Sequence, residues 1–349
     1  MYKTFSFLLI VCLFLTACNK QPQPFSSFED AQSALKTLNA ALIRSKTVEN
    51  EILTEQQLVF SEAYLAKRHA IYQGLMDMDL ESNQIAQVNY LVIAERFPER
   101  YFNWPAQINV LKNMLALNGK VYKPDSIIKW LKLTQDQLDS AVQSNLKLNK
   151  VELSLLQLHV DKTLQNNTIQ GALKSQLRSF RDYLDTYKAR GSIGLRGLAN
   201  GSEWYQSKLN YFSGSVHSPL EWSSILNKKI NTLKVTKPIL VSDVPAEHER
   251  SFTVRSLQGD TIIEGLDWQT HYIDLPSMAA NTETSADIYS LMLVMMETDI
   301  GIHYHAWTLP QARVNLVKRL NISDEFAHYL AEDIILFPGQ SFSFASKAL

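Results

Sequence analysis

Cysteine is nearly absent from this chain. Only Cys12 and Cys18 occur in 349 residues, and both lie at the very start. If the segment before Cys18 is removed and Cys18 itself carries lipid, no thiol is left for a disulfide, a thiolate zinc site or cysteine nucleophile chemistry. Stability must then come from a packed core, and the hydrophobic fraction of 46% is typical of a globular protein.

Several signatures of function are also missing. The formal net charge is −1 without a basic stripe, so nucleic acid is not an expected partner. No Gly-x-Ser-x-Gly element of a serine hydrolase occurs. The zinc signature His-Glu-x-x-His begins at His248-Glu249 but has Phe252 where the second histidine would stand. We therefore expect no metal and no cofactor.

Long apolar runs are absent beyond the start of the chain. Lys3 precedes the apolar run from Phe5 to Leu15, which is shorter than the roughly 20 residues of a spanning helix. A charged start, a short apolar run and small residues before a cleavage site are typical of a secretory signal. The order Leu-Thr-Ala-Cys18 indicates a bacterial lipoprotein signal, although an ordinary signal that contains a cysteine is the alternative. We expect lipid on Cys18 and, because residue 19 is Asn rather than Asp, an outer-membrane protein that faces the periplasm.

Helical periodicity dominates the rest. Leu173, Leu177, Phe180 and Leu184 recur at spacings of 4, 3 and 4, as on one face of a helix. Capping-box pairs are Thr134 with Gln137, Ser218 with Glu221, and Thr308 with Gln311, while Ser323 is a plausible N-cap. We predict helices near 28–46, 50–76, 80–96, 105–117, 124–131, 134–165, 169–188, 202–212, 219–233, 284–304, 309–319 and 323–335.

The expected fold class is mainly α, a multi-helix bundle-like array with a small β-hairpin in the C-terminal third. The hairpin falls at 251–264, where β-branched residues flank Gly259. Proline and polar residues suggest a soft boundary near 236–250. The predicted organisation is a signal peptide at 1–17, a lipid-anchored tether at 18–27, a helical domain at 28–235 and a smaller α+β part at 236–349 packed on it.

Histidine is enriched towards the C-terminus. Five of the eight histidines lie at or after position 248, which raises the hypothesis of a zinc site. However, His303 and His305 point apart on a helix because they are two residues apart. For His303 the competing interpretation is a structural histidine near a helix end, and for His248 it is an exposed loop residue.

Two segments together resemble a known bacterial family. The first runs from Gly197 to Tyr205 (GLANGSEWY) and continues to His217-Ser-Pro-Leu-Glu221. The second begins with Glu297-Thr-Asp299-Ile-Gly301-Ile-His303, carries Trp307, Gln311 and Ala312, and is followed by Phe337-Pro-Gly-Gln340. In order and spacing both are similar to the family called domain of unknown function 885.

The resemblance implies a helical fold related to zinc metallopeptidases with a glutamate ligand. Members usually carry a His-Glu-x-x-x-x-His-His motif and a Glu-Gly-Trp-Ala motif. The resemblance implies that Glu264-Gly265 is what remains of the second motif, with Leu266 and Asp267 in place of its Trp and Ala, and the two-histidine motif has no counterpart. A catalytic zinc normally needs three protein ligands. The resemblance therefore implies a shortened member that keeps the scaffold without the metal site.

Three functions stay open at this point. The first is a non-catalytic lipoprotein that binds a peptide, an envelope component or another protein. The second is a zinc metallopeptidase with a rearranged site, formed by His248, Glu264, His271 and His303. The third is a purely structural envelope lipoprotein. The candidate cleft residues are Asp299, His303, Glu264, Trp307 and Gln340, the lipidation site is Cys18, and no residue is assigned as a metal ligand.

Overall fold

The structure is a computed structural model that describes residues 25–38, 58, 60–96, 110–111, 114–115, 123–232 and 285–345. All regular elements in these ranges are helices, and none of the described residues forms a strand of a sheet. The chain is thus mainly α, as predicted. The expected hairpin at 251–264, the boundary near 236–250, Cys18 and Glu264 lie outside the described residues. Among the described helices, none combines the length and apolar character needed to cross a bilayer.

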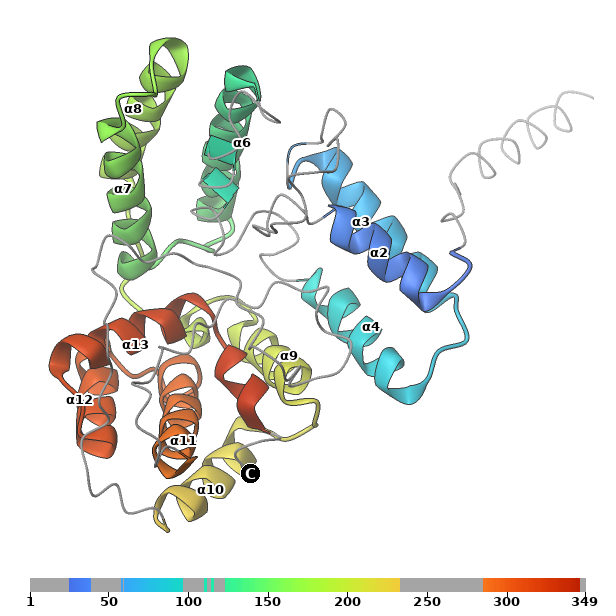
Figure 1. The fold of residues 1–349 in the computed structure, drawn as a ribbon, viewed down its shortest axis with the longest axis vertical. Helices are drawn as coiled ribbons and strands as arrows, with labels where there is room; N and C mark the ends of the chain where they lie inside the picture. Colours follow the sequence, from blue (N-terminus) through green and yellow to red (C-terminus); the bar gives the residue numbers. More distant parts are fainter. Residues whose placement is uncertain are drawn as a thin grey trace, which may run out of the picture.

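The N-terminal helices form a small group at one end of the molecule (Figure 1). They are α2 (Phe28–Leu38), α3 (Glu62–Met76) and α4 (Ser82–Ala94). Helix α2 packs on α3, α3 packs on α4, and α4 contacts α9 of the C-terminal group. Arg68 of α3 is buried, with its guanidinium 5.4 to 5.9 Å from the ring centres of three aromatic residues.

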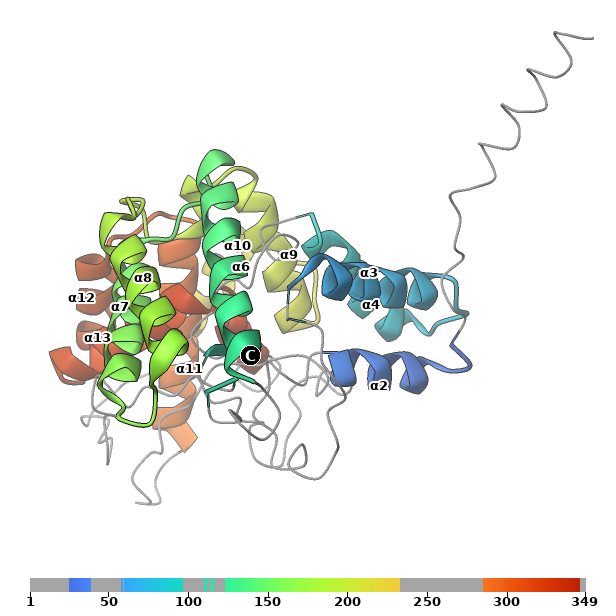
Figure 2. The same ribbon diagram turned by 90° about the horizontal axis from the view of Figure 1, so that it is seen from above.

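The next three helices form an arm: α6 (Pro124–Gln143), α7 (Lys150–Gln165) and α8 (Gly171–Thr186). Helix α8 packs on both α6 and α7, and its predicted stripe Leu173, Leu177, Phe180 and Leu184 is buried. In both views the arm stands beside the C-terminal helices (Figures 1 and 2).

The predicted helix start at Thr134 is wrong, because α6 continues through it. Thr134 is buried inside this helix, and the Gln137 side chain donates a hydrogen bond to the Phe60 carbonyl (2.7 Å) instead of closing a capping box. The break falls later, where Asn145 adopts a left-handed φ of 59°. Asn149 and Glu152 then form the capping box that starts α7.

The C-terminal group surrounds α11 (Ser285–His303). It contains α9 (Gly201–Ser213), α10 (Pro219–Ile230), α12 (Leu309–Leu320), α13 (Asp324–Leu336) and the 3-10 turns η3 (Leu195–Gly197) and η4 (Gln340–Phe344). The predicted N-caps Ser218, Thr308 and Ser323 are confirmed, since each side chain accepts a hydrogen bond from a backbone N–H of the first turn. Helix α11 contacts α10, α12, α13, η3 and η4, so its C-terminal half lies in the interior.

Candidate functional site

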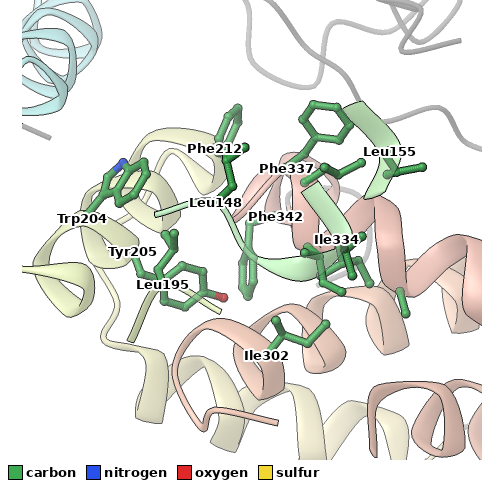
Figure 3. Packing of buried hydrophobic residues seen from close by; sticks show 14 of the residues in the cluster. Leu148, Leu155, Leu195, Trp204, Tyr205, Phe212, Ile302, Ile334, Phe337 and Phe342 are labelled. Carbon is green, nitrogen blue, oxygen red and sulfur yellow. The ribbon is translucent and has the colours of Figure 1, made fainter. Parts of the chain in front are cut away.

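The C-terminal end of α11 carries two polar side chains into the core. Asp299 and His303 are four residues apart, on one face of the helix, and both are 0% exposed. Apolar residues from α7, η3, α9, α11, α13 and η4 pack together in this part of the core, among them Ile302, the chain neighbour of His303 (Figure 3). Such burial requires that every polar atom find a partner within the protein.

Asp299 accepts hydrogen bonds from three separate groups. The Tyr205 hydroxyl donates to Oδ1 (2.8 Å), the Ser341 hydroxyl donates to Oδ2 (2.6 Å), and the Gly339 N–H lies 3.0 Å from both oxygens. Burial raises the pKa of Asp299 to about 7, and the hydrogen bonds from Ser341, Tyr205 and Gly339 act in the opposite direction. The carboxylate therefore joins α11 to α9 and to the η4 segment.

His303 is held by backbone groups on both sides of its ring. Nδ1 accepts a hydrogen bond from the Leu195 N–H (3.3 Å), and Nε2 lies 2.9 Å from the Ile334 carbonyl oxygen. A carbonyl only accepts, so Nε2 carries the proton and the ring is neutral. Burial lowers the pKa of His303 to about 3. Both ring nitrogens are thus hydrogen-bonded in this arrangement, since Nε2 carries the proton and the lone pair of Nδ1 accepts from the Leu195 N–H.

A short clip, residues 190–197, connects this site to the arm. Gly194 sits so close to α11 that a Cβ there would lie 2.0 Å from the Ile302 carbonyl oxygen, so any larger residue would push the clip away. Arg190 donates hydrogen bonds to the carbonyls of Lys147 (2.9 Å) and Gly194 (2.7 Å). The Asn149 side chain donates to the Ile193 carbonyl (3.2 Å). Together these bonds fix the first turn of α7 to the end of α11.

The other predicted site residues lie at different depths. Trp307 is half-buried and packs on Gly301, where a Cβ would come within 2.1 Å of the indole ring. Gln340 is 7% exposed at the start of η4, close in sequence to the Gly339 and Ser341 groups that bind Asp299. The structure thus brings Asp299, His303 and the Gln340 segment together. That they line a cleft stays a prediction.

Several residues of the site were not foreseen. Tyr205 lies in the Gly197–Tyr205 segment, but nothing in the sequence indicates its bond to Asp299, and Arg190, Asn149 and Ser341 are not among the predicted site residues. Asn149 with Glu152, three residues later, has the spacing of a capping box and was a usable signal. A lone arginine or serine carries no such pattern.

The chemistry open to this arrangement is limited. A hydrolytic metal centre needs ligands with free lone pairs and an open coordination position. No group of three or more His, Cys, Asp or Glu side chains suited to a metal ion occurs in the described parts of the chain. The Asp299 carboxylate accepts hydrogen bonds, and the His303 imidazole accepts one and donates one. Through these bonds the two side chains connect separate segments of the fold.

Comparisons with known proteins give one informative match. No family model matches the chain, and no curated protein matches it in sequence. A crystal structure of a candidate lipoprotein from Colwellia psychrerythraea is similar in fold, with a TM-score of 0.51 over 91% of this chain and 90% of that chain. The sequence identity is 11%, so the similarity shows a shared helical fold and no shared activity.

Proposed function

We propose that this chain is a lipoprotein of the bacterial outer membrane, anchored through Cys18 and facing the periplasm, whose helical body is a non-catalytic binding module for a peptide or envelope protein. Its signal segment with Leu-Thr-Ala-Cys18 supports the anchor. The fold it shares with a candidate lipoprotein is consistent with that location. We also propose that the body is a relative of the domain of unknown function 885 family that keeps the scaffold without the two-histidine metal motif.

One observation carries the non-catalytic part of this proposal. In the segment that resembles the family, Nδ1 of His303 accepts a hydrogen bond from the Leu195 N–H, and its Nε2–H donates to the Ile334 carbonyl. Asp299 likewise has its oxygens bonded to Tyr205, Gly339 and Ser341. The two side chains that could act in catalysis, Asp299 and His303, therefore stabilise the fold through their hydrogen bonds. A scaffold can persist without the chemistry of its relatives.

The metal content of the soluble chain tests this part. Residues 19–349, purified without a metal-affinity step, should contain no stoichiometric zinc and should not cleave unstructured peptides. One tightly held divalent ion per molecule would support the alternative, a zinc peptidase with a site from His248, Glu264, His271 and His303. In that case His303→Gln should release the ion, whereas a ring that only packs would leave it bound.

The anchor is tested separately. Mass analysis of the amino-terminal peptide from bacterial membranes should show a chain that begins at Cys18 and carries acyl groups. Cys18→Ser is the matched control, because the serine hydroxyl cannot receive the thioether-linked lipid. An unmodified amino terminus in the wild-type protein would contradict the anchor and leave the interpretation of the core untouched.

A further inference from the structure

The start of α2 and the turn between α3 and α4 lie at the same end of the molecule (Figures 1 and 2). Helices α2 and α3 pack side by side, which brings the first residues of α2 to the last residues of α3. Phe25, the first described residue, is only seven positions after Cys18. Seven residues span at most about 25 Å even when fully extended. Lipid on Cys18 would therefore keep Phe25 within that distance of the bilayer, and the neighbouring end of α3 close to it.

Apolar side chains are exposed at this end. Met76, the last residue of α3, is 50% exposed, and Ile85, in the first turn of α4, is 46% exposed. Met78 and Leu80 of the connecting turn are half-buried, as is Phe25. Exposed apolar residues occur elsewhere too, so exposure alone does not select this end. What distinguishes it is its short distance from the lipid.

We propose that this tether-proximal end, made of Phe25, Met76, Met78, Leu80 and Ile85, rests on the bilayer that holds Cys18. The proposal builds on the lipid anchor proposed above. A lipid tether keeps the protein next to the bilayer, which raises the effective concentration of the membrane near the patch. A small apolar patch that is too weak to bind membranes from solution can therefore contact the bilayer when the protein is anchored. The arm and the C-terminal helices then point away from the membrane, towards periplasmic partners.

The charges at this end define the lipid surface that it fits. Glu29 and Asp30 of α2 are exposed, and so are Asp77, Asp79 and Glu81 around the turn. From residue 76 to 94 the sequence contains no lysine or arginine. Anionic lipid attracts basic segments and repels acidic ones. The expected partner is therefore a zwitterionic surface with ammonium headgroups, such as phosphatidylethanolamine, that can lie beside carboxylates.

Depth-dependent fluorescence quenching tests the contact on the full lipidated protein. Cys12 is lost with the signal and the Cys18 thiol is consumed by lipid, so one introduced cysteine is the reactive thiol. Met76→Cys and Ile85→Cys would be labelled with an environment-sensitive dye and reconstituted into phosphatidylethanolamine–phosphatidylcholine vesicles that contain nitroxide lipids. Val314→Cys is the matched control, since Val314 is also 50% exposed and lies on α12, at the opposite side of the molecule in both views.

We expect quenching at positions 76 and 85 to exceed that at 314 several-fold, and to fall when phosphatidylglycerol replaces part of the neutral lipid. Equal quenching at all three positions, in protein whose acylation is confirmed by mass, would overturn the proposed contact. Stronger quenching on anionic vesicles would overturn the charge argument. Loss of vesicle co-flotation together with an unmodified Cys18 would instead count against the anchor. Met76→Asp with Ile85→Asp, checked for native helicity, should reduce the contact.

Discussion

The arm and the end of α11 hold their segments together in different ways. In the arm, α8 buries a regular apolar stripe, and the ion pairs of this helix are at least partly exposed, such as Arg181 with Asp161 (2.7 Å). At the end of α11, polar groups lie inside the core and bind hydroxyl and backbone groups of distant segments. An apolar stripe tolerates small shifts of one helix along another. A buried carboxylate with three donors fits one arrangement only, since each lost bond leaves a buried group unpaired.

The largest expected effect follows from removing the carboxylate at the end of α11. Asp299→Ala would leave the Gly339 N–H and the hydroxyls of Tyr205 and Ser341 without their acceptor. Each unsatisfied buried group costs about 1–3 kcal/mol, so we expect a loss of about 4 kcal/mol in the free energy of unfolding. Chemical denaturation of the soluble chain measures it.

Asp299→Asn is the matched control for this variant. The amide keeps one acceptor oxygen and the volume of the side chain, so its loss should be clearly smaller than that of the alanine variant. If Asp299→Ala unfolds like the wild-type protein while binding of a partner is lost, Asp299 serves a site rather than the scaffold.

In the arm, Leu177→Ala should come next in size. Leu177 is 0% exposed in the middle of the stripe of α8. Substitution of a buried leucine by alanine costs about 3 kcal/mol through lost burial and a residual cavity. Leu177→Met is the control, because it keeps most of the volume and should lose less than about 1.5 kcal/mol. Equal losses for both variants would contradict the view that this helix is held by its apolar stripe.

A dependence on pH separates the two regions further. His303 is neutral in the folded protein, with its pKa lowered to about 3, whereas an unfolded histidine titrates near 6.5. The folded state therefore binds fewer protons between these values, and the contribution of His303 to stability is lost as the pH falls below about 6.5. Between these two pKa values, His303 should make the free energy of unfolding fall by about 1.4 kcal/mol for each unit by which the pH is lowered.

His303→Gln isolates this contribution. The variant should be less stable than the wild-type protein at pH 7.5, and the deficit should shrink as the pH falls from 6.5 towards 4.5. Glu152 and Asp299 have pKa values raised to about 7 by burial, so their contributions fall as the pH rises, but they titrate in both proteins and cancel in the difference. In Leu177→Ala the deficit should stay constant over the same range. A constant deficit in His303→Gln would show that the ring is not held neutral.

The contrast also explains what could be predicted from the sequence. The stripe of α8 and the N-caps Ser218, Thr308 and Ser323 depend on residues three or four apart, so local patterns reveal them. The false start at Thr134 shows the limit of such patterns. A capping-box spacing can occur inside a helix, where the long-range bond from Gln137 to the Phe60 carbonyl competes with it.

The bonds at the end of α11 connect residues far apart in the chain. Tyr205 and Asp299 are separated by 94 positions, and Leu195 and His303 by 108. No periodicity in one sequence indicates such pairs. The resemblance points to Asp299 and His303, but it does not indicate that Asp299 binds two hydroxyls and one N–H, or that both partners of His303 are backbone groups. The interpretation of His303 as a structural histidine was among the alternatives, and the geometry favours it.

The smallest expected effect concerns the surface of the arm. Arg181 pairs with Asp161 and Asp185, and the side chain of Asp185 is 56% exposed. Exposed ion pairs contribute between about 0.2 and 1 kcal/mol, because water screens the charges and the long side chains lose freedom. Arg181→Ala should therefore lose less than about 1 kcal/mol, and this loss should fade in 1 M salt, where the Debye length is about 3 Å. A loss in the free energy of unfolding close to that of Leu177→Ala, and unchanged in salt, would show that the ion pairs stabilise the arm as much as its apolar stripe does. Polar contacts would then stabilise both the arm and the end of α11.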